Sequence, residues 1–143
     1  MVEFYRSSPG VNKFFDTVTD VNRYQTPSYR VVEFSWKSGR YRLLSTGDFY
    51  QLNYCGIPVL IHPFKDSYRG YEYASVSITE QNNGYYMRSR KRYHLKDLIW
   101  SAFGDHHVDR GWHVVCKDEN IMNCKIENLE VRKRGVSSKG GSL

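Results

Sequence analysis

Short runs of β-branched and aromatic residues, separated by glycine-containing turns, are the feature that most limits the folds open to this chain. Such runs occur at residues 29–36, 41–44, 49–52, 71–78 and 85–93. The second and third runs enclose the turn Ser45-Thr46-Gly47-Asp48, and the last two are joined through Asn83-Gly84. Because glycine and asparagine tolerate the positive φ angles of tight turns, the pattern predicts small antiparallel hairpins.

Helical spacing replaces this pattern at residues 94–103, and Gly104 follows as a stop signal. The apolar residues on one face of the predicted helix are Leu95, Leu98, Ile99, Ala102 and Phe103. After the helix, strand-like runs at 112–116 and 129–132 flank an Asp/Asn-rich loop at 117–124. The order of the elements predicts an α+β fold, in which small antiparallel hairpins are followed by a helix and two further short strands.

The balance of charge indicates an anionic partner. The formal net charge is +6 and the isoelectric point is near 9.2, so the chain can release counterions from a phosphate backbone. Nucleic acid is therefore the leading candidate. A solvated basic surface without a partner has the same composition, so the positions of the charges must separate the two.

Alternating arginines occur within the run 85–93. An extended strand presents Arg88, Arg90 and Arg92 on one face, where guanidinium groups can bind phosphate oxygens in pairs. The alternative is an edge strand protected from aggregation by its charges. A second basic cluster lies near the C-terminus, where the alternative is a solubilising tail. The residues expected to contact nucleic acid are Arg88, Arg90, Lys91, Arg92, Arg132, Lys133 and Arg134.

Cysteine usage and hydropathy predict a cytoplasmic protein without a membrane partner. Cys55, Cys116 and Cys124 lack paired Cys-x-x-Cys spacing, so we expect reduced thiols rather than a disulfide framework or a zinc ribbon. The longest apolar run, 57–61, is too short to span a bilayer. The first residues also lack the apolar stretch of a secretory signal.

A motif near the C-terminus carries a family resemblance. The segment from Val114 to Leu129 resembles the ββα finger of HNH nucleases, in which Asp-His precedes Asp-Gly-Asn, Asn-Asn and Ile-Glu-Asn-Leu. The residues at matching positions are Asp118, Asn120, Asn123, Ile126, Glu127, Asn128 and Leu129. The predicted helix at 94–103 and the hairpin at 41–50 are similar to segments of phage-type HNH homing endonucleases. The resemblance extends over residues 35–134 and implies a DNA-binding frame.

The positions that perform chemistry in this family differ here. The family cuts DNA with a histidine base and a divalent metal, which is held by Asp or His and by a later Asn or His. Val115 and Cys116 stand at the Asp-His positions, and a Gly/Ser-rich stretch around Ser137 stands at the last ligand. Valine cannot bind a metal, and a thiol is a poor base near neutral pH. The resemblance therefore implies no catalytic residue, no metal and no cofactor.

The polar residues that do match the family have a simpler interpretation. Their side chains can hydrogen-bond to neighbouring backbone and hold an irregular turn. The residues interpreted as loop-structuring are Asp118, Asn120, Asn123 and Asn128. Remnants of a metal site are the alternative.

The resemblance also suggests how the chain is divided. We expect an N-terminal arm or extra element at residues 1–28 and a hairpin-rich, DNA-binding-like region that ends in a helix at 29–104. An incomplete ββα (His-Me/HNH-like) finger follows at 105–134, and a flexible Gly/Ser-rich tail at 135–143.

These features predict a catalytically inactive protein of phage origin that binds double-stranded DNA in the cytoplasm of a bacterial host. One alternative is an active endonuclease that uses Mg²⁺ or another divalent metal, with a site relocated to His106, His107, His113 and Cys116. A zinc site made by His113, Cys116 and Cys124 is a second alternative. A third is a phage protein that binds and inhibits a host protein through aromatic residues of its N-terminal arm.

Overall fold

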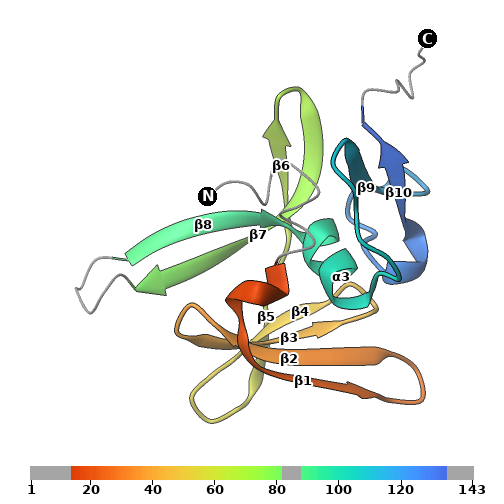
Figure 1. The fold of residues 1–143 in the computed structure, drawn as a ribbon. Coiled ribbons are helices and arrows are strands. Elements are labelled where there is room, and N and C mark those ends of the chain that lie inside the picture. Colours follow the sequence, from red (N-terminus) through yellow and green to blue (C-terminus); the bar gives the residue numbers. More distant parts are fainter. Residues whose placement is uncertain (1–13, 82–87, 135–143) are drawn as a thin grey trace.

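The computed structural model describes residues 14–81 and 88–134 (Figure 1). Within these ranges the chain forms antiparallel strands around one α-helix, which confirms the predicted α+β class. The elements in chain order are η1 (Phe14–Thr17), β1 (Thr19–Gln25), β2 (Arg30–Trp36), β3 (Gly39–Leu44), β4 (Phe49–Leu52), β5 (Pro58–Leu60), β6 (Phe64–Tyr68), β7 (Tyr71–Gln81), β8 (Arg88–His94), α3 (Leu95–Phe103), β9 (Trp112–Cys116), η2 (Ile126–Asn128) and β10 (Leu129–Lys133). No helix in the described part of the chain has the length and apolar character needed to cross a membrane.

The described strands form three antiparallel sheets. Strands β1 to β5 form a meander in sequence order, β7 lies between β6 and β8 in a second sheet, and β9 pairs with β10. The predicted hairpin around Gly47 is confirmed as β3 and β4. The second predicted hairpin is confirmed as β7 and β8, while its turn, at residues 82–87, lies outside the described residues. Helix α3 and strands β9 and β10 begin and end within one or two residues of the predicted positions.

The strands that the sequence pattern did not predict lie at the edges of their sheets. Strands β1, β5 and β6 each pair with a single neighbour. All residues of β1 and β5 are exposed, so neither strand has the apolar alternation of a half-buried strand. Strand β1 lies within the predicted N-terminal element, and η1 before it inserts Phe14 into the core. Residues 14–25 of that element are therefore an integral part of the first sheet and its core.

Helix α3 lies where the three sheets meet and contacts β3, β7, β8 and β9 (Figure 1). Its apolar face is buried as the helical spacing predicts, with Leu98 and Ile99 completely shielded from solvent. An aromatic contact joins the first two sheets, because Trp36 of β2 packs on Tyr93 of β8 with 4.9 Å between ring centroids. Removal of these apolar surfaces from water stabilises the arrangement of the sheets around the helix.

The turn between β3 and β4 packs directly against the loop that follows β9. The backbone N–H of Ile126 donates to the carbonyl oxygen of Ser45 at 2.9 Å. Gly47 has a φ angle of 97°, and a Cβ atom there would lie 3.0 Å from backbone atoms of Cys124 and Lys125. Only glycine allows both this backbone conformation and this close approach. The β3–β4 hairpin and the finger-like segment, Val114 to Leu129, are therefore in contact in the folded protein.

This contact predicts an unequal cost for the same substitution at two glycines. Gly56 also has a positive φ, of 80°, but a Cβ atom there meets nothing within 4 Å. We expect Gly56→Ala to lower the free energy of unfolding by about 1 kcal/mol through backbone strain alone. Gly47→Ala should cost about 2–4 kcal/mol, because steric overlap is added to the strain. Urea unfolding followed by tryptophan fluorescence measures both, and equal losses would show that the turn does not dock on the loop.

Candidate nucleic-acid interface

Two exposed arginines of β8 share one face of the second sheet. Arg90 and Arg92 are separated by one residue, so their side chains project to the same side of the strand. The Arg90 Nε–H donates to the Ser77 hydroxyl oxygen at 3.2 Å. Side chains of β6 and β7 complete this surface, which we call the β8 face. Its described members are Arg90, Arg92, Ser77, Thr79 and Asp66.

Asp66 of β6 offsets part of the positive charge on the β8 face. Its Oδ1 lies 3.1 Å from Nη1 of Arg92, and the two side chains are 19% and 60% exposed. A pair this accessible to water adds at most about 1 kcal/mol to stability, but its carboxylate weakens the field that an approaching phosphate meets. Sequence patterns missed Asp66 because they did not predict β6.

The other predicted contact residues are not gathered on the β8 face. Lys91 lies on the opposite side of β8, and the side chain of Arg88 lies outside the described residues. Arg132 is ion-paired with Glu130 of its own strand, with 2.5 Å between Nη2 and Oε2. The C-terminal basic residues lie on or directly after β10, on the other side of α3 from β8 (Figure 1): Arg132, Lys133 and Arg134. The two basic clusters predicted from the sequence therefore belong to different sheets.

A lysine links the second sheet to the β9–β10 hairpin. Lys96, in the first turn of α3, donates from Nζ to the carbonyl oxygen of Val114 at 2.5 Å. The same Nζ lies 5.0 Å from the ring centroid of Tyr73, which packs against His94 with 4.2 Å between centroids. Burial lowers the pKa of Lys96. Lys96 therefore connects the second sheet to the β9–β10 hairpin. No sequence pattern identified this role.

Burial keeps the two histidines near this junction uncharged at neutral pH. Burial, with a smaller effect of Lys96, lowers the pKa of His94 to about 3. Burial, with smaller effects of Lys96, Arg134 and Arg132, lowers the pKa of His113 to about 4. A neutral imidazole adds nothing to the attraction of phosphate, so the positive charge of this region comes from arginine and lysine.

Asp118 organises the loop between β9 and η2. Its Oδ1 accepts hydrogen bonds from the Asn120 backbone N–H and from Asn128 Nδ2, both at 2.9 Å. Its Oδ2 accepts from Asn123 Nδ2 at 2.9 Å, and Asn128 Nδ2 also donates to the Asn123 carbonyl at 2.8 Å. The bond from Asn128 is the largest of these influences that hold the pKa of Asp118 below its usual value. Asp118, Asn120, Asn123 and Asn128 are thus joined to one another by hydrogen bonds within the loop.

Glu119 adopts an unusual backbone conformation within this loop. Its φ angle is 64°, in the left-handed region that favours glycine. The HNH finger that the segment resembles has glycine between the Asp and Asn that align with Asp118 and Asn120. The loop therefore holds a glutamate where its backbone suits glycine better.

The two residues at the family's Asp-His positions, Val115 and Cys116, point to opposite faces of β9. Cys116 is 8% exposed and faces the core, while Val115 lies on the opposite face of β9. The neighbouring Cys124 thiol lowers the pKa of Cys116, with a smaller contribution from Lys96. Among residues 14–81 and 88–134, no group of three or more His, Cys, Asp or Glu side chains is placed to hold a metal ion. Ser137 lies outside these ranges.

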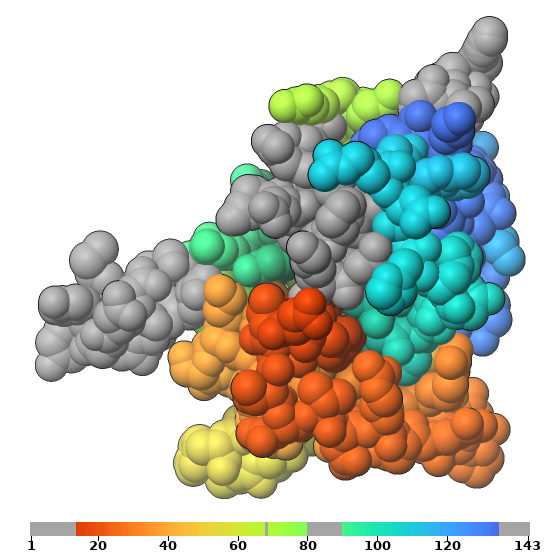
Figure 2. All heavy atoms as spheres, in the orientation of Figure 1, coloured from red at the N-terminus to blue at the C-terminus, as the bar shows by residue number. Residues whose placement is uncertain are grey.

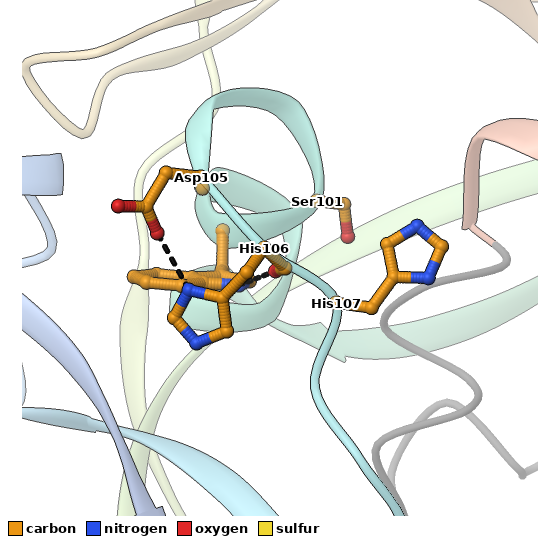
Figure 3. A pocket seen from close by; sticks show the side chains of 6 residues that line it. Ser101, Asp105, His106 and His107 are labelled. Atoms are coloured by element: carbon orange, nitrogen blue, oxygen red, sulfur yellow. Dashed lines mark hydrogen bonds and ion pairs between the residues drawn. The ribbon is translucent and has the colours of Figure 1, made fainter.

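The histidines suggested for a relocated site are only partly brought together. His106 and His107 line a shallow hollow of about 230 Å³ beside the C-terminal end of α3, and their rings point in different directions (Figure 3). His106 Nδ1 lies 2.6 Å from a carboxylate oxygen of Asp105, and the Ser101 hydroxyl donates to the Asp97 carbonyl. His113, on β9, does not line this hollow.

No family model, no curated protein and no solved structure matches this chain. The HNH resemblance therefore rests on the residues of the finger motif and stays a hypothesis.

The left-handed backbone of Glu119 predicts that a substitution there stabilises the fold, whereas most substitutions destabilise a protein. We expect Glu119→Gly to raise the free energy of unfolding by about 0.5–1 kcal/mol, because glycine removes the left-handed strain. Glu127→Gly, at an exposed position of η2, should lower it by about 0.5–1 kcal/mol. Chemical denaturation measures both values. Destabilisation by both substitutions would show that Glu119 carries no strain.

The buried histidine predicts acid sensitivity. The pKa of His94 is 6.5 in the unfolded chain and about 3 in the folded protein, so stability is complete above pH 6.5 and is lost as the pH falls toward 3. From about pH 7 to pH 5 this loss is about 2 kcal/mol. His94→Gln should therefore lose about 2 kcal/mol less than the parent protein over this interval.

A second variant checks the sign of this effect. Burial raises the pKa of Asp97 to about 6, so its protonation stabilises the fold as the pH falls from 6 toward 3.8. Asp97→Asn removes this gain and should lose about 1 kcal/mol more than the parent protein between about pH 7 and pH 5. Urea unfolding at both pH values gives the differences. Parallel curves for all three proteins would contradict the assignment.

Proposed function

We propose that this protein binds double-stranded DNA through the β8 face and does not cleave it. The observation that carries the proposal is the exposure of Arg90 and Arg92 side by side on a strand that Tyr93 anchors in the core from its other face. In an extended strand, alternate residues are about 7 Å apart, so each guanidinium group can bind a separate phosphate. Tyr93 holds the strand in place, so the backbone that carries the two arginines is already ordered before binding.

The neighbouring polar groups support contact with a phosphate backbone. Ser77 and Thr79 lie across from Arg92 and Arg90, and hydroxyl groups are common donors to phosphate. Asp66 acts in the opposite direction, because its carboxylate repels phosphate and competes for Arg92. The proposed interface therefore contains both an attractive and an opposing group, and each can be changed separately.

Two observations support binding without cleavage. The histidine base of the HNH family is replaced by Cys116, which faces the core, and one metal ligand is replaced by Val115. Neither side chain offers what a metal-assisted hydrolysis needs, an accessible base and a ligand for a divalent cation.

The first test is the salt dependence of binding to a random-sequence duplex. If the two arginines neutralise about two phosphates, affinity should fall roughly tenfold between ~50 and ~200 mM salt. Fluorescence anisotropy with a labelled duplex measures this slope. An affinity that does not change with salt, or no binding at ~50 mM salt, would refute the proposal.

Three variants of the chain locate the interface. Arg92→Gln should weaken binding and reduce the steepness of the salt dependence by about one phosphate contact. Asp66→Asn should strengthen binding, since it removes a negative charge from the same face. Arg40→Gln makes the same charge change on β3, in a different sheet from the β8 face, and should leave affinity within about twofold. Equal effects of Arg92→Gln and Arg40→Gln would show that only net charge matters.

A cleavage assay tests the second half of the proposal. Supercoiled plasmid incubated with the protein and Mg²⁺, Mn²⁺ or Zn²⁺ should stay intact. Nicking that disappears in Cys116→Ala or His113→Ala would establish an active nuclease and overturn the inactive assignment.

A further inference from the structure

The β4–β5 hairpin forms an exposed surface without formal charge. Residues 49–64 contain no Asp, Glu, Lys or Arg, although 25% of the chain is charged. The hairpin, yellow in Figures 1 and 2, projects beyond β1 and β2. Three of its exposed apolar side chains lie at the tip or on one face of β5, and we call them the apolar hairpin patch: Tyr54 (100%), Ile57 (58%) and Val59 (54%). Leu60 (37%) projects from the opposite face of β5. Neighbouring exposed apolar side chains of this kind commonly mark an association site.

The tip of this hairpin is held in a defined conformation. The side-chain oxygen of Asn53 accepts hydrogen bonds from the backbone N–H groups of Cys55 and Ile57, at 2.9 and 3.0 Å. The Asn53 N–H also donates to the Ile57 carbonyl, and the Gly56 N–H donates to the Asn53 carbonyl. Tyr54 and Ile57 are therefore presented on an ordered turn, which lowers the entropic cost of burying them in a complex.

The free edge of β5 is suited to side-chain packing and not to strand addition. Ile57 and Ile61 form backbone hydrogen bonds with Asn53 and Phe49, so the backbone groups of the alternate residues, Pro58 and Leu60, face the open edge of β5. Pro58 has no N–H group to donate there, so a continuous ladder with another strand is blocked. A partner must therefore bind the apolar side chains themselves.

We propose that the apolar hairpin patch is the contact surface of a symmetric dimer of this protein. Each copy has a formal net charge of +6, so most ways of bringing two copies together place like charges in contact. The uncharged hairpin is a surface at which two copies meet without that repulsion, and a two-fold axis pairs the same patch on both. The opposite edge, β1, also exposes Val21, but beside it stand Asp20 and Arg23. The proposal does not depend on DNA binding.

The size of the patch sets the expected strength of the dimer. A standard stable interface uses about 20–30 residues from each partner, and this hairpin offers far fewer. We therefore expect a reversible dimer with a dissociation constant of about 10–100 μM. Sedimentation velocity without nucleic acid, under reducing conditions, should show the weight-average mass rise from monomer toward dimer between ~5 μM and ~500 μM.

A pair of matched variants locates the dimer contact. Ile57→Lys places a charge in the patch and should weaken dimerisation at least tenfold, while Val21→Lys makes the same charge change on β1 and should have no effect. Both residues are more than 40% exposed, so both variants should fold, and circular dichroism checks this. Val59→Lys is a second probe of the patch if Ile57→Lys alters the hairpin.

The outcomes that overturn the proposal are specific. A monomer at every concentration up to ~500 μM excludes the dimer, and a dimer that resists both lysine variants in the patch places the contact elsewhere. If Ile57→Lys leaves the mass unchanged but lowers affinity for a DNA duplex, the hairpin contacts nucleic acid and the dimer proposal is wrong.

Discussion

The packing of Tyr93 on Trp36 determines how the surface of the second sheet is oriented. Strand β8 lies at the edge of that sheet, and neighbouring residues of a strand point to opposite sides. Once Tyr93 is held against the aromatic core of the first sheet, Arg92 must face outward, and Arg90 with it. The same contact fixes the start of α3, which follows β8 without a loop and carries Lys96 to the β9–β10 hairpin. Core packing thus positions both the charged surface and the finger-like segment.

Local sequence patterns predict the parts of this fold that carry a regular spacing of apolar residues. The β3–β4 hairpin, the α3 helix and the β9 and β10 strands have regular apolar spacing and glycine or asparagine turns, so their positions are predictable. Strands β1 and β5 are exposed throughout, and their structure comes from pairing with a neighbouring strand. Such strands leave no periodic signal, since both of their faces meet water.

The candidate site is predictable only where it lies within one strand. The alternation of Arg90 and Arg92 is visible in the sequence, and both are exposed in the structure. Asp66 is 26 residues from Arg92 in the chain, and no local pattern links the two. The neutral state of His94 likewise comes from burial between elements. Because Asp66 pairs with Arg92 only in the folded protein, the arginines predicted from the sequence form a surface whose positive charge is partly neutralised.

Direct observation of the arginine side chains during binding tests the central claim most closely. Arginine Nε–H signals of ¹⁵N-labelled protein can be followed by NMR while a DNA duplex is added, and Arg→Lys variants assign them. The account predicts that the signals of Arg90 and Arg92 shift at low DNA ratios, while that of Arg40 on the first sheet stays in place. Shifts confined to arginines outside β8, or none when the duplex is saturating, would contradict it.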